Sequence, residues 1–499
     1  MNAQSYSVET SYGALRGEDF GDVTVYRGVP YARPPLNELR FAAPEPLSPW
    51  QGVRDATLYG PAAMQAKPQG STFGMFGPGG REISEDCLYL NVWVPNTATP
   101  DKPVMVWIHG GIFRMGTGGS PTYEASRLAA YGDVIVVTIN YRLGCFGFLH
   151  APGEATSNAG LLDQLAALNW ISAEIGAFGG NPDNVTLFGE SAGAKSIECL
   201  MASPRASGLF HRGILQSTYR LDMNPETAIQ TTQRLLDAAG VDSVDGLIRM
   251  DAEALQGAHQ AMTVGVTAGQ NPAGFCPVID GDLLPVDTLD AIREGTGAPL
   301  PAIIGTNRDE MRLFGMMDMQ SGLESEKLMA RLKAQNPQMP EQKLHGVIES
   351  YTEARRTRDE PVEPLDVWFD LATDKLFRMH SIELAETLAL AAPVRTYRFD
   401  WKSQAFNGAL GALHGLEMAF TFRNMEEEMG KIAGPGPEAT HLCDIMQTFW
   451  TRFAHGENLS DWPLYEPGGR LTMIFGKDSR VEAAPQEAER LAFLACFSG

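Results

Sequence analysis

Apolar and polar residues alternate near the start of the chain and later gather into short continuous runs. Residues 8–10 and 23–26 alternate, with glycines nearby, which predicts short antiparallel strands. The runs 104–108, 134–139 and 185–188 are short, largely apolar and bounded by turn residues. Runs of this kind are typical of strands that are buried on both faces of a sheet.

A helical period replaces the strand pattern between residues 158 and 175. Leu161, Leu165, Leu168 and Ile171 fall on one face of this segment. A strand, a helix and a strand in that order predict two parallel strands joined by a right-handed crossover. The fold class that follows is α/β, with an open and mostly parallel sheet.

Two further blocks, approximately residues 225–262 and 323–390, are mostly helical in pattern, and we expect them beside or above the sheet. The Pro- and Gly-rich stretch 67–80 predicts a surface loop whose phenylalanines and methionine either anchor it or cover a pocket: Phe73, Met75 and Phe76. No internal repeat or long linker divides the sequence, so we expect a single domain over residues 1–499.

Composition narrows the possible partners. The formal net charge of −22 disfavours nucleic acid and anionic membranes, which bind clustered Lys and Arg. Residues 1–9 lack the basic and apolar parts of a secretory signal, and no later segment reaches the roughly 18 apolar residues of a membrane span. We therefore expect a soluble, cytoplasmic protein. Its cysteines are scattered without metal-ligand spacing and are predicted to be free thiols: Cys87, Cys145, Cys199, Cys276, Cys443 and Cys496.

The sequence 189–193, Gly-Glu-Ser-Ala-Gly, lies between a predicted buried strand and a stretch able to start a helix. Small residues at both ends allow a sharp turn, which presents the Ser191 hydroxyl near the positive end of that helix. In this context the motif indicates a catalytic nucleophile. A serine at neutral pH needs a base, and the base needs an orienting carboxylate.

In such folds the acid and the histidine follow the serine along the chain. His414 lies in a loop with flanking glycines, where an imidazole is freely presented, and the other histidines after Ser191 suit surface or helix-face positions better. Spacing alone leaves the acid open. Glu310 is a candidate because it follows a strand end and a turn, where open α/β sheets place groups that face a ligand.

Several motifs together resemble the type-B carboxylesterase family, which includes cholinesterases, and are most similar to its bacterial para-nitrobenzyl esterases. The matching segments run nearly end to end: RGVPYARPP at 27–35, SEDCLYLNVWVP at 84–95, WIHGG at 107–111, NYRLGCFGF at 140–148, NAGLLDQLAALNW at 158–170, FGGNPDNVTLFGESAG at 178–193, GTNRDE at 305–310 and HGLEMAFTF at 414–422. The resemblance implies an α/β-hydrolase fold with a large mixed sheet and helical insertions over the active site.

The resemblance also implies roles for single residues. Ser191 is then the nucleophile, His414 the general base and Glu310 its orienting acid. An oxyanion hole is implied from the backbone N–H groups of Gly111, Ile112 and Ala192, and a buried hydrogen-bond network from Glu190, Ser217 and Glu417. For the last three a purely structural role is equally compatible. No metal or organic cofactor is implied; the partners are an ester and water, and a monomer is favoured.

Two departures from the family pattern affect the expected substrate range and compartment. Ile112 stands where the family has a small residue. Its backbone N–H can still serve as an oxyanion-hole donor if the local φ is negative, but its β-branched side chain crowds the site. We therefore expect poor acceptance of bulky esters. Residues 62–64, Ala-Ala-Met, lack the cysteine that many secreted relatives pair with the one at Cys87, which favours a reducing compartment.

Apolar residues next to the catalytic segments predict a pocket for uncharged esters of small to medium size: Phe113, Met115, Phe275, Met311 and Phe314. Two alternatives stay open. The same triad could cleave carbamates or amides, or the chain could be a non-catalytic adhesion or scaffold module. The second alternative is disfavoured because the sequence keeps all three triad residues.

Overall fold

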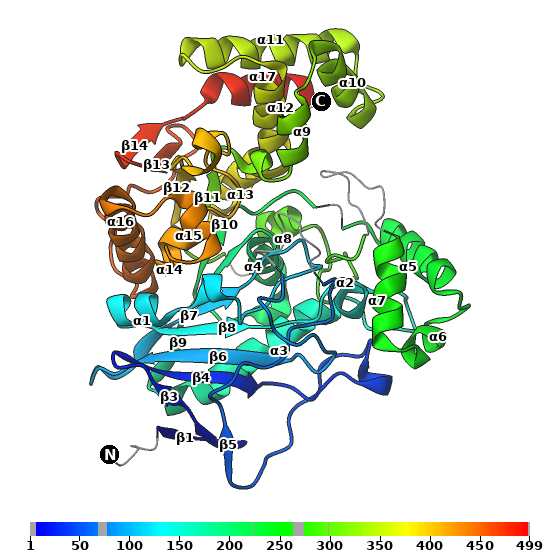
Figure 1. Ribbon diagram of the computed structural model, residues 1–499, viewed down its shortest axis with the longest axis vertical. Helices are drawn as coiled ribbons and strands as arrows, with labels where there is room; N and C mark the ends of the chain where they lie inside the picture. Colours follow the sequence, from blue (N-terminus) through cyan, green and yellow to red (C-terminus); the bar gives the residue numbers. More distant parts are fainter. Residues whose placement is uncertain (1–5, 68–76, 222, 263–273, 298, 498–499) are drawn as a thin grey trace.

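The computed structural model describes residues 6–67, 77–221, 223–262, 274–297 and 299–497. Within these residues an eleven-stranded sheet runs through the molecule (Figure 1). In spatial order its strands are β14 (Arg480–Ala483), β13 (Leu471–Phe475), β12 (Val394–Phe399), β11 (Ala302–Asn307), β10 (Arg212–Gln216), β9 (Gly180–Glu190), β7 (Lys102–Ile108), β8 (Ile135–Ile139), β6 (Tyr89–Pro95), β4 (Val23–Pro30) and β3 (Glu18–Asp19).

The middle of this sheet is parallel and its edges are antiparallel. Strands β8 through β13 pair in parallel, whereas β6, β4 and β3 at one edge and β14 at the other pair antiparallel. A second sheet near the N-terminus contains β1 (Ser7–Thr10), β2 (Gly13–Arg16) and β5 (Val53–Asp55). The predicted α/β fold with a large, mostly parallel sheet is confirmed, and so are the short antiparallel strands at the start.

Strand β7 shows why the short apolar runs form central strands. Val104, Val106 and Ile108 belong to one hydrophobic cluster, while the alternate residues Met105 and Trp107 belong to another on the opposite face. A strand segment buried on both faces needs apolar residues at successive positions, and residues 104–108 of this strand have them. The two clusters form the core, with one on each face of the sheet.

Helices cover both faces of the sheet. The first cluster includes residues of α3 (Ala159–Glu174), α4 (Ala192–Ala202), α8 (Thr288–Glu294) and α13 (Met379–Leu388). The second includes residues of α1 (Ser126–Gly132), α14 (Met418–Phe422), α15 (Glu428–Ala433) and α16 (Pro437–Ala454). Helix α2 (Gly144–Phe148) packs against α3.

The two helical blocks form separate regions beside the sheet (Figure 1). The block 225–262 contains α5 (Pro225–Ala239), α6 (Val244–Arg249) and α7 (Ala252–Ala261). The block 323–390 contains α10 (Ser325–Gln335), α11 (Glu341–Thr357), α12 (Pro364–Thr373) and α13, preceded by α9 (Met316–Ser321). The C-terminal helix α17 (Glu487–Phe497) packs against α11 at the top of the view. The single domain over residues 1–499 stays a prediction.

Strand topology differs from the simplest crossover. Helix α3 connects β8 to β9 as predicted, and both strands run in the same direction. They are not neighbours, however, because β7 lies between them and pairs with both. The hydrophobic period of the sequence indicates the direction of the two strands but not which strand lies between them.

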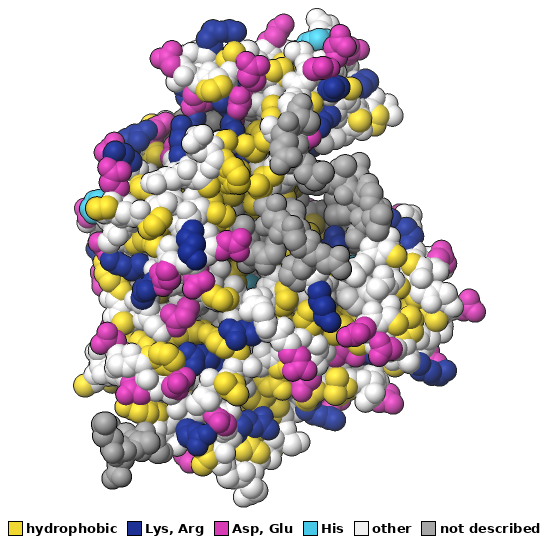
Figure 2. Space-filling model, viewed as in Figure 1, with side chains coloured by type: hydrophobic (Ala, Val, Ile, Leu, Met, Phe, Trp, Pro, Cys, Tyr) yellow, Lys and Arg dark blue, Asp and Glu magenta, His cyan; other side chains and the backbone are white. Residues whose placement is uncertain are grey.

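Several sequence predictions concern the surface and the thiols. All six cysteines are free, as predicted, and all six are buried. On the face shown in Figure 2, Lys and Arg side chains are scattered among Asp and Glu. No described helix combines the length and apolar character needed to cross a membrane. The cytoplasmic location and the monomeric state stay predictions, and Phe73, Met75 and Phe76 lie outside the described residues.

A buried ion pair joins α3 to the loop after β8. Asp163 accepts hydrogen bonds from Arg142 Nε at 2.8 Å and Nη2 at 2.7 Å, and also from the Arg142 backbone N–H at 3.0 Å. Both side chains are at most 3% exposed. The leucine face of α3 is buried as predicted, but this polar face is buried as well, because the helix lies inside the protein.

Asp163→Ala should lower the free energy of unfolding by about 3–5 kcal/mol, because the change leaves the Arg142 charge buried without its partner. Urea unfolding measures the effect. The matched control is Glu438→Ala at the exposed pair with Lys477, 2.8 Å apart, which should cost no more than about 1 kcal/mol. Equal losses in both variants would contradict the importance of burial.

Candidate active site

The serine turn lies at the point where β9 ends and α4 begins. Ser191 connects Glu190, the last residue of β9, to Ala192, the first of α4, with φ 56° and ψ −121°. A side chain at Gly193 would overlap the carbonyl oxygen of Ile108 in β7, and one at Gly189 would lie 2.8 Å from the Gly193 carbonyl carbon. The two glycines therefore permit the close approach that holds Ser191 in this conformation.

His414 and Glu310 come together from distant segments. His414 Nδ1 lies 2.6 Å from Glu310 Oε2, and both side chains are nearly inaccessible to solvent. Glu310 begins a short 3-10 helix directly after β11, and its Oε1 accepts bonds from Ser217 Oγ and the Asn307 N–H, both at 2.7 Å. These bonds fix the carboxylate so that it faces Nδ1, the arrangement that orients an imidazole.

The other nitrogen of His414 faces a second carboxylate. Nε2 lies 2.9 Å from Glu190 Oε1, although the approach is not aligned as a hydrogen bond. Burial alone would lower the pKa of His414, but the negative charges of Glu190 and Glu310 outweigh it and raise the pKa well above 6.5. In the described part of the chain no hydrogen bond joins His414 to Ser191, yet both residues line one pocket.

A third buried carboxyl group, that of Glu417, completes the polar network. It accepts hydrogen bonds from Gln216 Nε2 at 3.1 Å and Asn307 Nδ2 at 2.5 Å. Burial and the nearby charges of Glu190 and Glu310 raise the pKa of Glu417 to about 8. This group therefore carries a proton at neutral pH, which limits the negative charge around His414.

The loop after β7 turns tightly beside Ser191. The Gly111 carbonyl accepts hydrogen bonds from the N–H groups of Arg114 at 3.0 Å and Met115 at 3.1 Å. None of the described residues accepts a hydrogen bond from the N–H groups of Gly111, Ile112 or Ala192. Gly111 and Ile112 line the pocket, and Ala192 directly follows Ser191.

The negative φ named above as the condition for the Ile112 N–H to serve is not found. Ile112 has φ 51° and the following Phe113 has φ 58°, both in the left-handed region. A β-branched residue in this conformation is strained by about 1–2 kcal/mol. The loop keeps the left-handed form because its hydrogen bonds and the close contact between Gly111 and Met115 determine the backbone. Ile112 is 36% exposed and its side chain lines the pocket.

The pocket encloses about 310 Å³, counting the part open to solvent, and is lined by Gly111, Ile112, Met115, Glu190, Ser191, Leu313, Phe314 and His414. Met115 and Phe314 therefore lie where the sequence predicts them. The other three candidates do not line it. Phe113 packs edge-on against Phe148 and Phe275 against His259, with ring centres 5.0 Å apart in each pair, and Met311 belongs to the large hydrophobic cluster.

Two residues near the site were missed at the level of sequence. Leu313 lines the pocket, and the Phe377 ring centre lies 4.8 Å from that of His414. Phe377 belongs to a π-helical turn, Asp374–Arg378, between α12 and α13. The apolar pattern predicts helix in this block but does not show which of its residues face His414.

A buried ion cluster holds helix α4 one turn beyond Ser191. Lys195 Nζ donates to Glu198 Oε1 at 2.6 Å, and His380 Nε2 lies 2.9 Å from Glu198 Oε2. Hydroxyl groups of Thr218 and Thr288 donate to the same carboxylate at 2.7 and 2.6 Å. Burial opposes ionisation, but the charges of His380 and Lys195 hold the pKa of Glu198 below its usual range. The cluster connects α4 with α8 and α13.

The described residues contain no group of three or more His, Cys, Asp or Glu arranged to hold a metal ion.

A family model described as the carboxylesterase family matches residues 4–493, which is nearly the whole chain. The chain belongs to the carboxylesterase family.

The esterase is similar to several known proteins over almost its full length. It is 39% identical to the para-nitrobenzyl esterase of Bacillus subtilis strain 168 over 97% of each chain. It is 35% identical to the phenmedipham hydrolase of Pseudarthrobacter oxydans, covering 95% of this chain and 96% of that one. A solved PNB esterase matches with a TM-score of 0.86 at 37% identity, covering 98% of this chain and 99% of that chain.

A solved carboxylesterase of Geobacillus stearothermophilus matches with a TM-score of 0.84 at 37% identity, covering the same shares of the two chains. The chain is thus a serine carboxylesterase with the α/β-hydrolase fold. The alternative of a non-catalytic adhesion module is not supported by these relatives.

Glu190→Gln removes one of the two negative charges beside His414, so we expect its pKa to fall. If the neutral imidazole acts as the base, esterase activity is lost in acid below that pKa, and the acid limb of kcat/KM should move to lower pH than in the wild type. Hydrolysis of a p-nitrophenyl ester between about pH 5 and about pH 8 measures the limb.

Glu417→Gln is the matched control, because the Glu417 carboxyl already carries a proton at neutral pH and its amide replacement changes little charge. Glu417→Gln should therefore shift the acid limb of kcat/KM less than Glu190→Gln does. A limb that stays at its wild-type position in Glu190→Gln contradicts this electrostatic account.

Proposed function

We propose that the esterase hydrolyses carboxylic esters with Ser191 as nucleophile, His414 as general base and then acid, and Glu310 as the orienting carboxylate. The observation that carries the proposal is the buried 2.6 Å contact between His414 Nδ1 and Glu310 Oε2, beside a pocket that Ser191 also lines. A bond from Nδ1 to a carboxylate leaves Nε2 as the nitrogen that exchanges a proton with the serine.

In the first half of the reaction, Ser191 Oγ attacks the ester carbonyl carbon while His414 Nε2 takes the hydroxyl proton. The tetrahedral intermediate then collapses, His414 gives the proton to the leaving alcohol, and an acyl-enzyme remains. In the second half, water attacks the acyl carbon with the help of the same imidazole. The acid product leaves and the Ser191 hydroxyl is restored.

Negative charge develops on the carbonyl oxygen in both halves. We propose that the N–H groups of Gly111, Ile112 and Ala192, which donate to none of the described residues, donate to this oxygen. Donors fixed by the backbone need no reorganisation during the reaction, and losing one typically costs about 100- to 1,000-fold in rate. The left-handed backbone at Ile112 contributes to the direction of these groups.

Glu190 supports the positive imidazole that forms when His414 takes the serine proton, because its Oε1 lies 2.9 Å from Nε2. In the free enzyme Nε2 faces this carboxylate. We propose that substrate binding brings Nε2 and Ser191 Oγ into hydrogen-bond contact, since catalytic hydrogen bonds often tighten only in the substrate complex. Ser217 and Glu417 hold Glu310 and Asn307 in place through the bonds described above.

The pocket supports uncharged esters of small to medium size as substrates. Its side chains are mainly apolar, with Met115, Leu313 and Phe314 around the serine. A buried negative charge at Glu190 disfavours an anionic substrate next to it.

Cleavage of carbamates or amides by the same residues is a second candidate. The relatives' names, phenmedipham hydrolase and cocaine esterase among them, show that substrates differ within the family. Hydrolysis rates of a matched ester, carbamate and anilide distinguish the two candidates: the ester should be cleaved fastest, and a faster carbamate or anilide would favour the second.

Ile112→Gly should widen the range of esters toward bulkier groups, because it removes a branched side chain from the pocket wall. Since glycine adopts a φ near 51° without strain, the variant should fold at least as stably as the wild type. The ratio of kcat/KM for a bulky and a short ester measures the first effect, and thermal unfolding the second. An unchanged ratio would reject the crowding account.

Ser191→Ala should abolish nearly all turnover of a short-chain p-nitrophenyl ester, with a loss of roughly a million-fold in kcat, because the acyl-enzyme can no longer form. The change removes only one oxygen, so the fold should be unaffected. Active-site function of Ser191 is excluded if the purified variant hydrolyses the ester at the wild-type rate.

A further inference from the structure

Asp309, the neighbour of Glu310, makes a pair of hydrogen bonds with the loop that carries His414. Its N–H donates to the carbonyl of Ala412 at 3.0 Å, and its Oδ2 accepts from the N–H of Ala412 at 2.9 Å. Ala412 precedes His414 by two residues. The segment that provides the orienting acid is therefore bonded directly to the segment that provides the imidazole.

The loop is shaped to receive this carboxylate. Gly411 has φ 57°, and a side chain at this position would overlap the Asp309 carboxylate. The Asp309 side chain thus occupies the space in which a residue other than glycine would place its own. The Asp309 side chain is 12% exposed.

Arg312 extends the contact toward the helical block. Its guanidinium donates to Asp309 Oδ1 at 3.3 Å, to the carbonyl of Ala409 at 2.9 Å and to Asp366 Oδ1 in α12 at 2.6 Å. The Arg312 side chain therefore connects the turn that contains Glu310, the loop that contains His414 and helix α12 of the block 323–390. A planar guanidinium with five N–H donors suits such a triple contact.

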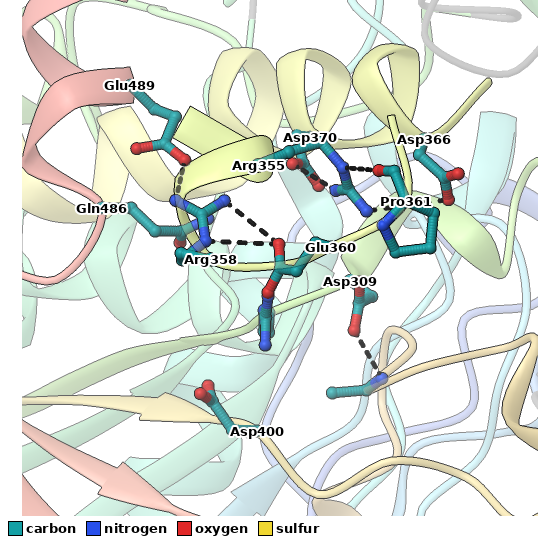
Figure 3. Close-up of polar contacts among 12 residues, drawn as sticks. Asp309, Arg355, Arg358, Glu360, Pro361, Asp366, Asp370, Asp400, Gln486 and Glu489 are labelled. Atoms are coloured by element: carbon teal, nitrogen blue, oxygen red, sulfur yellow. Dashed lines mark hydrogen bonds and ion pairs between the residues drawn. The ribbon is translucent and has the colours of Figure 1, made fainter. Parts of the chain in front are cut away.

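Further ion pairs connect the same turn to the end of the chain (Figure 3). Arg308 pairs with Glu360, which also lies 3.2 Å from Arg358, and Arg358 pairs with Glu489 of α17. Arg355 pairs with Asp370 at 2.5 Å beside Asp366. Arg308, two residues before Glu310, is thus linked through Glu360 and Arg358, in the segment between α11 and α12, to α17.

We propose that Asp309 is a positioning residue for the reaction: through Ala412 it holds the His414 loop at the distance that lets the imidazole meet Glu310. The inference rests on the triad of the proposed function. Among the described residues Asp309 makes no hydrogen bond to Ser191, Glu310 or His414, so it acts only through the loop. Loss of its bonds loosens the 2.6 Å contact between Nδ1 and Glu310.

Asp309→Ala tests the proposal on a p-nitrophenyl ester. We expect kcat to fall by about 10- to 100-fold with little change in KM, because a small misplacement of a catalytic group has effects of this size. The acid limb of kcat/KM should move to lower pH, because an imidazole farther from Glu310 has a lower pKa. Asp309→Asn, which keeps an oxygen for the Ala412 N–H, should recover most of the lost kcat.

Asp400→Ala is the matched control, because Asp400 pairs with Arg398 at 2.6 Å, is 15% exposed and makes no described bond to the His414 loop. It should change the melting temperature without moving kcat or the acid limb. Gly411→Ala provides a second test that removes no charge, since the added methyl group displaces the carboxylate, and it should reproduce the loss seen in Asp309→Ala.

Wild-type kcat and an unmoved acid limb in Asp309→Ala or in Gly411→Ala would overturn the positioning role. An equal fall of kcat in Asp400→Ala would overturn it too, because general destabilisation would then explain the loss. Failure of the proposed function gives a different result: Ser191→Ala, measured in the same assay, would retain turnover, or the wild type would not cleave the ester.

Discussion

The site depends on one buried imidazole, His414, held between the carboxylates of Glu310 and Glu190. Glu190 is the last residue of β9 and Glu310 follows the end of β11, while β10, between them, leads into Ser217. Because these strands are bonded in parallel, their ends meet at one edge of the sheet. The sheet therefore sets the positions of the charges, and the loop of His414 needs only to bring the ring to them.

This arrangement concentrates negative charge in a place with little water. Glu190, Glu310 and Glu417 are all buried together, and three ionised carboxylates there would repel one another strongly. The protein relieves the repulsion in two ways: Glu417 has a pKa of about 8 and keeps its proton, and His414 has a raised pKa. In the proposed reaction, the charges that raise the pKa of His414 would also stabilise the imidazolium and set the pH at which the base becomes neutral.

Sequence reasoning succeeded where the determinants are local. The turn at Ser191 follows from two glycines and a strand next to a helix, and β7 follows from an unbroken apolar run. It failed where tertiary contacts decide the backbone. The left-handed φ of Ile112 comes from bonds within its loop, the Phe377 ring reaches His414 through a π-helical turn, and the bond from Asp309 to Ala412 joins segments about a hundred residues apart. Such pairings leave no periodic mark in the sequence.

The most direct measurement is identification by mass spectrometry of the residue that a fluorophosphonate labels in the native protein. Such a reagent reacts with a serine that a neighbouring base has activated. The account predicts a single modification, on the peptide containing Ser191, which is lost in a His414→Ala variant that still folds. Labelling of another residue, or equal labelling of Ser191 in the variant, would contradict the central role of the Ser191, His414 and Glu310 arrangement.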